Sequence, residues 1–248
     1  MTIKSNYVGE DLEVHAPHQK GTVYSLDALC SGRTVVLKVF GRFGCPFTRR
    51  DAHLLSQQQQ QLEGLGAHLV GIGFDEEGLA EFSLQRFWHG EMFLDHDRCM
   101  YNFFQLKRTS KLKAIELLMN SKTRSIYSAA KKEFGATRHG DELQTGGVFV
   151  INGKGRVIYA CPQPNITLAS NVEKILEVCR NESLRRIIRP VPRKMYTPKP
   201  ICYLPPVEIS AAATLRHYFS DSSIASNETF SSLTCYRFMQ LNQEEEAN

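Results

Sequence analysis

Cys45 stands where an apolar run gives way to a helical pattern, and it is the strongest candidate for chemistry in the chain. The apolar run, residues 35–40, is followed by Gly41 and Gly44, and Pro46 suits the first turn of a helix. A cysteine just before a helix lies beside unpaired N–H groups and the positive end of the helix dipole, which favour the nucleophilic thiolate. The segment therefore predicts a partly exposed catalytic sulfur, with Pro46 as an auxiliary residue.

Polar side chains next to Cys45 could assist this sulfur. Arg42, Arg49 and Arg50 add positive charge that favours a thiolate, although each arginine taken alone is expected to be a solvated surface charge. Arg42 could also stabilise the oxygen that departs when a thiolate attacks a peroxide. Thr48 could donate its hydroxyl to the sulfur or bond to a helix carbonyl. Arg42 and Thr48 are therefore predicted to be auxiliary residues of the site.

A second thiol is missing from the position where a C-x-x-C pair would carry it, because residue 48 is a threonine. A hydroxyl does not form a disulfide, so Thr48 cannot resolve an oxidised Cys45. Three outcomes stay open: resolution by another cysteine of the chain, resolution by a small thiol such as glutathione, or loss of turnover that leaves a binding module. The candidate resolving cysteines are Cys30, Cys99, Cys161 and Cys202.

A zinc site is a third interpretation of the chemistry-bearing residues. His15 with His18, and His96 with Cys99, have the spacing of metal ligands. No C-x-x-C partner completes a tetrahedral set, so we expect no metal site.

Composition limits the classes of protein. The 248 residues can bury a core without disulfides, and the seven cysteines are an odd, scattered set typical of a reducing compartment. The first residues lack the apolar core of a signal peptide, and no apolar run approaches the ~18 residues of a membrane span. We therefore expect a cytoplasmic protein with no membrane span. A formal net charge of +4 does not by itself argue for a nucleic acid or a membrane as partner.

Strands and helices alternate in the predicted order of elements. Strands are predicted over residues 21–29 (a short edge strand and turn), 34–40, 67–74, 92–94, 147–151 and 156–161. Helices are predicted over residues 46–62, 76–87, 97–104, 111–134 and 171–187. The Asn152-Gly153 pair between two apolar runs is a strong hairpin signal. This order is that of a thioredoxin-like α/β fold, a central mixed sheet flanked by helices, with Cys45 in the first strand-to-helix turn.

Three regions are predicted along the chain: an N-terminal extension over residues 1–19, the thioredoxin-like domain over 20–187, and an extended tail over 188–248. Six of the ten prolines fall between Pro190 and Pro206, which prevents regular structure there. We expect this Pro-rich tail to be disordered.

Thr145 and Gly146 precede the predicted hairpin. In thioredoxin-like folds the loop at this point faces the reactive sulfur. Gly146 and Gly147 permit a close approach of backbone, so the main-chain groups of Thr145 and Gly146 could bind an extended substrate. The alternative is a plain turn into the strand.

The chain resembles the peroxiredoxin-like 2 family, most closely its prostamide/prostaglandin F synthase branch. Two segments carry most of this resemblance: VVLKVFGRFGCPFTRRDAHLLS and ELQTGGVFVINGKGRVIY. The connecting segments GEMFLDHDRCMYNFFQLKR and NVEKILEVC resemble the family too. The similarity extends over residues 20–180, and RFGCP is its most specific part. It implies a cytosolic antioxidant oxidoreductase of prostaglandin and lipid metabolism that reduces an endoperoxide. It also implies no bound cofactor, with NADP(H) as the indirect electron source through thioredoxin or glutathione.

The chain departs from that family at one position of its motif. The family carries C-x-x-C, and here only Cys45 matches. The P-x-x-x-T-x-x-C motif of true peroxiredoxins would need proline at Lys38 and threonine at Arg42, so two-cysteine peroxidase chemistry has no support in the local sequence. We therefore predict a thiol-dependent oxidoreductase that reduces a peroxide or endoperoxide through Cys45, with a monothiol route open. The alternative is a non-catalytic thioredoxin-like binding protein.

Overall fold

A computed structural model describes residues 6–9, 12–17, 22–138 and 140–188. All of the described residues belong to one compact unit, and a second unit, residues 202–248, lies wholly outside the described ranges. The predicted tail, residues 188–248, lies outside the described residues except for Ile188, which instead ends a helix, and Cys202 also lies outside them. No helix in the described part of the chain is both long enough and apolar enough to cross a membrane.

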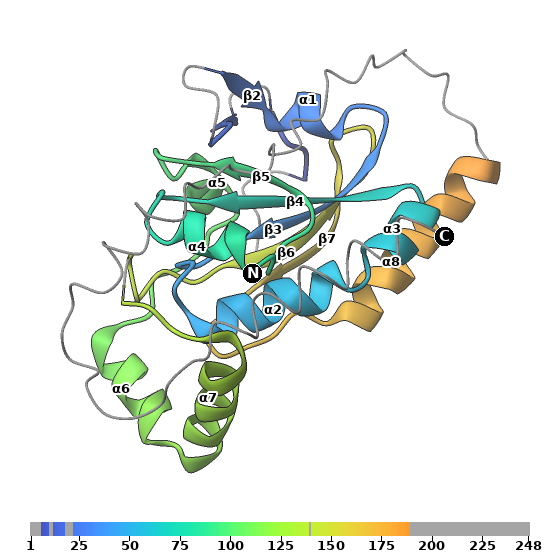
Figure 1. Ribbon diagram of the computed structural model, residues 1–248. Helices are drawn as coiled ribbons and strands as arrows, with labels where there is room; N and C mark the ends of the chain where they lie inside the picture. The colour runs from blue at the N-terminus through green and yellow to red at the C-terminus, as the bar shows by residue number, and fades with distance from the viewer. Residues whose placement is uncertain (1–5, 10–11, 18–21, 139, 189–248) are drawn as a thin grey trace, which may run out of the picture. The chain divides into compact units, whose positions relative to one another are not determined.

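One mixed sheet lies at the centre, and its seven strands within the described residues follow the order β2-β1-β5-β4-β3-β6-β7 (Figure 1). The strands are β1 (Glu13–His15), β2 (Val23–Ser25), β3 (Thr34–Val39), β4 (Ala67–Gly73), β5 (Glu91–Leu94), β6 (Gly147–Ile151) and β7 (Val157–Pro162). Strand β3 pairs in parallel with β4 and antiparallel with β6. The predicted α/β class with a mixed sheet is confirmed.

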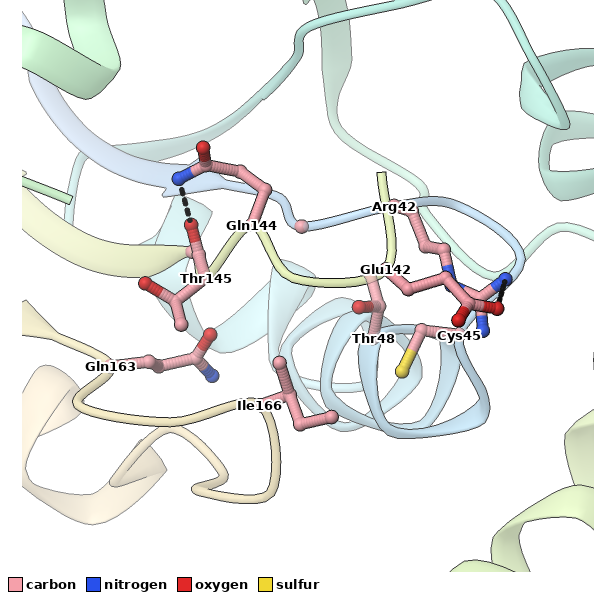
Figure 2. A pocket seen from close by; sticks show the side chains of 10 residues that line it. Arg42, Cys45, Thr48, Glu142, Gln144, Thr145, Gln163 and Ile166 are labelled. Carbon is pink, nitrogen blue, oxygen red and sulfur yellow. Dashed lines mark hydrogen bonds and ion pairs between the residues drawn. The ribbon is translucent and has the colours of Figure 1, made fainter. Parts of the chain in front are cut away.

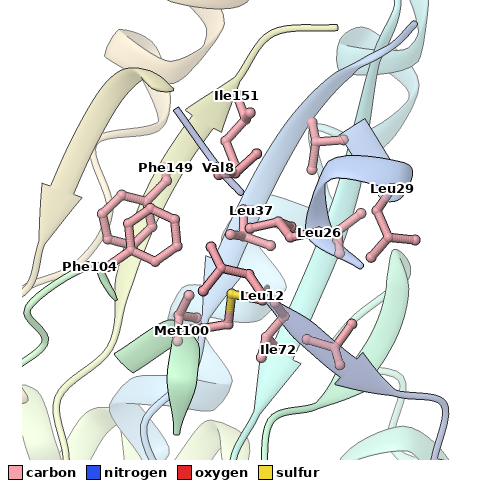
Figure 3. Close-up of a cluster of buried hydrophobic side chains, with 14 of the residues drawn as sticks. Val8, Leu12, Leu26, Leu29, Leu37, Ile72, Met100, Phe104, Phe149 and Ile151 are labelled. Carbon is pink, nitrogen blue, oxygen red and sulfur yellow. The ribbon is translucent and has the colours of Figure 1, made fainter. Parts of the chain in front are cut away.

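Helices cover both faces of this sheet (Figure 1). They are α1 (Leu26–Cys30), α2 (Pro46–Ser56), α3 (Gln59–Gly64), α4 (Leu79–Leu84), α5 (Cys99–Phe103), α6 (Lys111–Met119), α7 (Ser121–Phe134) and α8 (Val172–Ile188). One core cluster packs α1 and α5 against the sheet, and Phe104 stacks on Phe149 within it (Figure 3). The other cluster packs α2, α7 and α8 against the opposite face.

Strand β3 is central because both of its faces are buried. Val35 and Leu37 pack into the first cluster, and Val36 packs into the second. Such a run of β-branched residues without alternation is typical of a strand covered on both sides. Strand β3 therefore anchors the turn that carries Cys45.

Two predicted helices are each divided in two. The predicted helix 111–134 breaks at Asn120, whose side-chain Oδ1 accepts hydrogen bonds from the N–H groups of Lys122 and Thr123 and so caps the start of α7. The predicted helix 46–62 breaks after Ser56, where the N–H of Gln58 bonds to the carbonyl of Leu55, a tighter turn than the α-helix allows.

The N-terminal part contains two further differences from the predicted elements. Strand β1 lies in the segment assigned to an N-terminal extension, yet it pairs with β2 and with β5. The sequence predicted residues 26–29 as part of a strand and turn, but they belong to α1. A helix begins there because the Ser25 hydroxyl accepts a hydrogen bond from the N–H of Ala28 and caps it. The predicted hairpin is confirmed, and its turn is fixed by bonds from the N–H groups of Lys154 and Arg156 to Asn152 Oδ1.

Candidate active site

Cys45 is the N-cap residue of α2, as the sequence predicted, and Pro46 begins the helix. The backbone N–H of Cys45 donates to the carbonyl of Arg42 (3.2 Å), and its own carbonyl accepts from the N–H of Arg49 (3.0 Å). These bonds fix the backbone of the turn between β3 and α2, which places Cys45 at the helix start. Cys45 is 8 % exposed, less than the partial exposure that was expected.

The Cys45 pocket is a small hollow at the end of β3 (Figure 2). It is lined by Gly41, Arg42, Cys45, Thr48, Glu142, Gln144, Thr145, Gly146, Gln163 and Ile166. It encloses about 10 Å³, room for about one water molecule, and opens to solvent. The pocket thus brings together every residue that the sequence assigned to the site except Pro46.

The loop before β6 faces the sulfur, as expected. The carbonyl of Gln144 would lie 2.8 Å from a Cβ at position 41, so glycine at 41 permits this close approach. The N–H of Thr145 donates to the carbonyl of Lys107 (3.2 Å), and the carbonyl of Thr145 accepts from Gln144 Nε2 (3.0 Å). Most of the main-chain groups predicted to bind substrate are therefore engaged inside the protein.

Gly146 completes this loop beside the sheet. Its carbonyl accepts a hydrogen bond from the N–H of Gln163 (2.9 Å). Of the main-chain groups of Thr145 and Gly146, the N–H of Gly146 is the one that has no hydrogen-bond partner among the described residues. The N–H of Gly146 is therefore the free main-chain donor of this pair of residues.

Arg42 lines the pocket on the side of the β3–α2 turn (Figure 2). Its Nη1 donates to the carbonyl of Thr137 (2.6 Å) and pairs with Glu142 Oε1 (3.3 Å). Its Nε and Nη2 have no hydrogen-bond partner in the described part of the chain. Arg42 is thus anchored through one nitrogen and retains donors for a ligand.

Arg49 does not have the solvated position that was expected for it. Its side chain is wholly buried, where Nε donates to the carbonyl of Phe43 (2.9 Å) and Nη1 to the carbonyl of Phe134 (3.0 Å). Its Nη2 pairs with Glu81 Oε2 (2.8 Å). Arg49 therefore holds the Cys45 turn against α7 and α4, because distant carbonyls and a carboxylate satisfy its donors. Arg50, by contrast, is exposed.

A buried ion pair behind the pocket was missed by the sequence reasoning. Lys38 of β3 pairs with Asp51 of α2, and both side chains are buried. Asp51 also accepts hydrogen bonds from the N–H (2.7 Å) and the hydroxyl (2.8 Å) of Ser170, and from Gln163 Nε2 (3.2 Å). A lysine inside the otherwise apolar run of residues 35–40 was the signal that could have indicated a buried partner.

Within the described residues, no cysteine other than Cys45 lines the pocket. Burial raises the pKa of Cys30 to about 12 and that of Cys179 to about 12. Desolvation, together with nearby carboxylates, also raises the pKa of the exposed Cys99. Cys161 is half-buried on β7.

The histidines proposed as alternative ligands are only partly brought together. The rings of His15 and His96 lie 5.3 Å apart between centroids, whereas His18 is outside the described residues. Among the described residues, no group of three histidine, cysteine or acidic side chains could hold a metal ion.

Comparison with solved structures shows the same fold. The chain superposes on a cysteine-to-serine mutant of Xylella fastidiosa PrxQ with a TM-score of 0.52 at 13% identity, covering 74% of this chain and 98% of that chain. It superposes on a mutant of peroxiredoxin 6 from Arenicola marina with a TM-score of 0.50 at 15% identity, covering 76% of each chain. The thioredoxin-like fold of the peroxiredoxins is thereby shown.

Sequence comparison shows the family. Residues 54–165 match the family model described as AhpC/TSA antioxidant enzyme. The prostamide/prostaglandin F synthase of Xenopus tropicalis is 31% identical over 139 residues, which are 56% of this chain and 69% of that protein. The enzyme of the same name from Homo sapiens is 30% identical over 136 residues, 54% of this chain and 69% of that protein. The chain therefore belongs to the peroxiredoxin-like family of AhpC/TSA antioxidant enzymes, in the branch of the prostamide/prostaglandin F synthases.

Proposed function

We propose that the protein is a thiol-dependent oxidoreductase that reduces a peroxide or a lipid endoperoxide through Cys45. The observation that carries this proposal is the position of Cys45, at the N-cap of α2 and on the wall of a pocket. The names of its relatives, prostamide/prostaglandin F synthase, support an endoperoxide as the substrate class.

The first step needs one thiolate. The Cys45 sulfur attacks one oxygen of the O–O bond, an S–O bond forms, and the O–O electron pair leaves on the other oxygen as an alkoxide. The free Nε and Nη2 donors of Arg42 stabilise that alkoxide until water protonates it. A hydroperoxide leaves Cys45 as a sulfenic acid, and an endoperoxide leaves it as a sulfenate ester.

The second step needs an external thiol in this proposal. One glutathione thiolate attacks the oxidised sulfur, releases the bound oxygen as water or alcohol, and forms a mixed disulfide. A second glutathione then releases Cys45 as thiolate and leaves as glutathione disulfide, which NADPH reduces elsewhere. The monothiol route is supported by Thr48 at the second motif position and by the absence of another described cysteine from the pocket wall. A reducing compartment such as the cytoplasm would supply these thiols.

The pocket size bears on how a lipid would bind. The pocket encloses only about 10 Å³, far less than the roughly 300–1,000 Å³ of pockets that enclose a drug-sized ligand. The peroxide group can therefore enter beside Cys45, while most of an endoperoxide lipid stays outside the pocket.

A binding module without turnover is the second candidate function. The threonine at position 48 favours it, because the family motif is incomplete there. Alkylation separates the two candidates: a Cys45 that reacts with iodoacetamide at pH 7 no faster than a free thiol favours the binding module.

Turnover tests the proposal directly. The full chain is assayed by NADPH oxidation with cumene hydroperoxide or a prostaglandin endoperoxide, using glutathione with glutathione reductase, or thioredoxin with thioredoxin reductase. With glutathione as the donor, activity that is lost in Cys45→Ser and kept in Cys99→Ser, a variant of an exposed cysteine, supports the proposal.

The donor decides the route. Turnover with glutathione alone supports the monothiol route. Turnover with thioredoxin alone means that another cysteine resolves Cys45, which single serine variants identify among Cys30, Cys99, Cys161 and Cys202. No turnover with either donor contradicts the enzymatic proposal and leaves the binding module.

A further inference from the structure

Helix α6 carries a stripe of large apolar side chains in solvent. Leu112, Ile115 and Met119 are 81%, 56% and 74% exposed, and their spacing of three and seven residues places them on one face of the helix. Ala114 and Leu117, on the other side, are half-buried where α6 packs on α7. The described residues leave this stripe uncovered, although burying three such side chains would be favourable.

Positive charge is concentrated on the same two helices. Residues 111–134 contain six basic and two acidic residues, a net charge of +4, which equals the formal net charge of the whole chain. The six are all exposed, and none forms an ion pair with another described residue. They are Lys111, Lys113, Lys122, Arg124, Lys131 and Lys132. The net positive charge of the chain is therefore matched by these two helices alone, and the charges of all the other residues sum to zero.

These two helices, residues 111–134, are named here the α6–α7 hairpin, and the segments just before and just after it are hydrogen-bonded to residues that line the Cys45 pocket. Before the hairpin, the carbonyl of Lys107 accepts from the N–H of Thr145, a residue of the pocket wall. After it, the carbonyl of Thr137 accepts from Arg42 Nη1. The hairpin projects away from the sheet beside the start of α2 (Figure 1). A surface that bound the hairpin would thus lie close to the pocket.

We propose that the α6–α7 hairpin docks the protein on an anionic lipid surface. Exposed lysines and arginine would reach the lipid phosphates, while the apolar stripe of α6 would insert between the headgroups and the acyl chains. Charge complementarity specifies the partner, because the unpaired basic residues need an anionic surface and the stripe needs an apolar layer beneath it. The docking is independent of the reaction proposed above. If that reaction also holds, the membrane would hold the part of the lipid that the pocket cannot enclose.

Vesicle flotation of the full chain tests the docking. We expect binding to phosphatidylcholine vesicles that contain about 30 % phosphatidylserine, little binding to phosphatidylcholine alone, and release as salt rises from about 0.05 M to about 0.5 M. Each basic residue at the surface strengthens binding by about fivefold, so Lys111→Gln with Lys113→Gln should weaken it by about 25-fold. Leu112→Ser with Met119→Ser should weaken binding by about tenfold or more.

A matched control exists on α8, which also carries exposed apolar residues next to arginines. Leu184 and Ile187 are exposed there, and Leu184→Ser with Ile187→Ser should leave vesicle binding unchanged. All variants should keep the wild-type alkylation rate of Cys45, a readout of folding that does not require turnover.

Three results would overturn the docking proposal. The first is no binding to anionic vesicles. The second is binding that is insensitive to salt or is lost with the α8 pair instead of the α6 pairs. The third is a dimer that Leu112→Ser with Met119→Ser dissociates in the absence of lipid, because a second copy would then cover the stripe.

Discussion

Gln163 donates a hydrogen bond of 3.2 Å from Nε2 to Oδ2 of Asp51, across 112 residues of chain. The same nitrogen donates to the carbonyl of Leu168 (2.6 Å), so both of its hydrogens are used. The amide oxygen of Gln163 accepts no hydrogen bond from the described residues, and the side chain lies on the pocket wall (Figure 2). The buried pair of Lys38 and Asp51 thereby orients an acceptor at the site of Cys45.

The first prediction concerns this acceptor. Gln163→Leu should slow the reaction of Cys45 with a hydroperoxide, whose O–H can donate to the amide oxygen, by about 2–10-fold, the value of one hydrogen bond. Stopped-flow measurement of Cys45 oxidation checks it, with iodoacetamide alkylation expected to be unchanged. Ile166→Val alters the pocket wall without removing a polar group and is the control. Equal slowing in both variants would mean that the acceptor has no role.

The second prediction concerns the stability of the ion pair. Lys38→Met leaves the charge of Asp51 buried without its partner and should lower the free energy of unfolding by about 3–5 kcal/mol. Lys38→Met combined with Asp51→Asn should recover most of this loss, because no charge then stays buried. Denaturant unfolding measures both variants.

An exposed pair provides the comparison for Lys38. Lys174 bonds to Glu177 on the surface of α8, so Lys174→Met should cost about 0–1 kcal/mol. A loss in Lys38→Met no larger than that in Lys174→Met would contradict the structural role of the buried pair.

The third prediction concerns the missing thiol. Thr48 lies one helical turn after Cys45 and lines the same pocket, so Thr48→Cys should form a C-x-x-C disulfide with it. Turnover with thioredoxin should then rise several-fold, as NADPH oxidation would show, while Thr48→Ser should bring no rise. A disulfide seen by mass spectrometry without faster turnover would mean that resolution does not limit the rate.

The fourth prediction concerns alkaline pH. Burial raises the pKa of Cys30 from its usual 9.0 to about 12, partly opposed by Arg33. Above pH 9 the unfolded chain loses this proton while the folded protein keeps it, so stability is complete below pH 9 and declines as pH rises towards 12. Between pH 8 and 10 we expect a loss of roughly 1–2 kcal/mol from this group. Cys30→Ala should be less stable than the wild type at pH 8, but its free energy of unfolding should decline less steeply as pH rises. An equal decline in the wild type and in Cys30→Ala would contradict the assignment of this pH dependence to Cys30.

Local signals in the sequence determined much of the fold. Three signals each act over a few residues: the apolar run predicted strand β3, the glycines and proline around Cys45 predicted the start of α2, and the Asn152-Gly153 turn predicted the hairpin. The alternation of strands and helices then predicted the mixed sheet. The ends of helices were less predictable, because a single cap such as Asn120 decides where one ends and the next begins.

Contacts between distant segments decided the rest of the site. Arg49 is buried because Phe134 and Glu81 provide acceptors, and the N–H of Thr145 is engaged because Lys107 lies opposite. The sequence identified the residues that could do chemistry and the turn that presents the sulfur. Only the tertiary structure decided which polar groups satisfy one another and which stay free for a ligand, because a buried donor takes whichever acceptor the fold brings within about 3 Å.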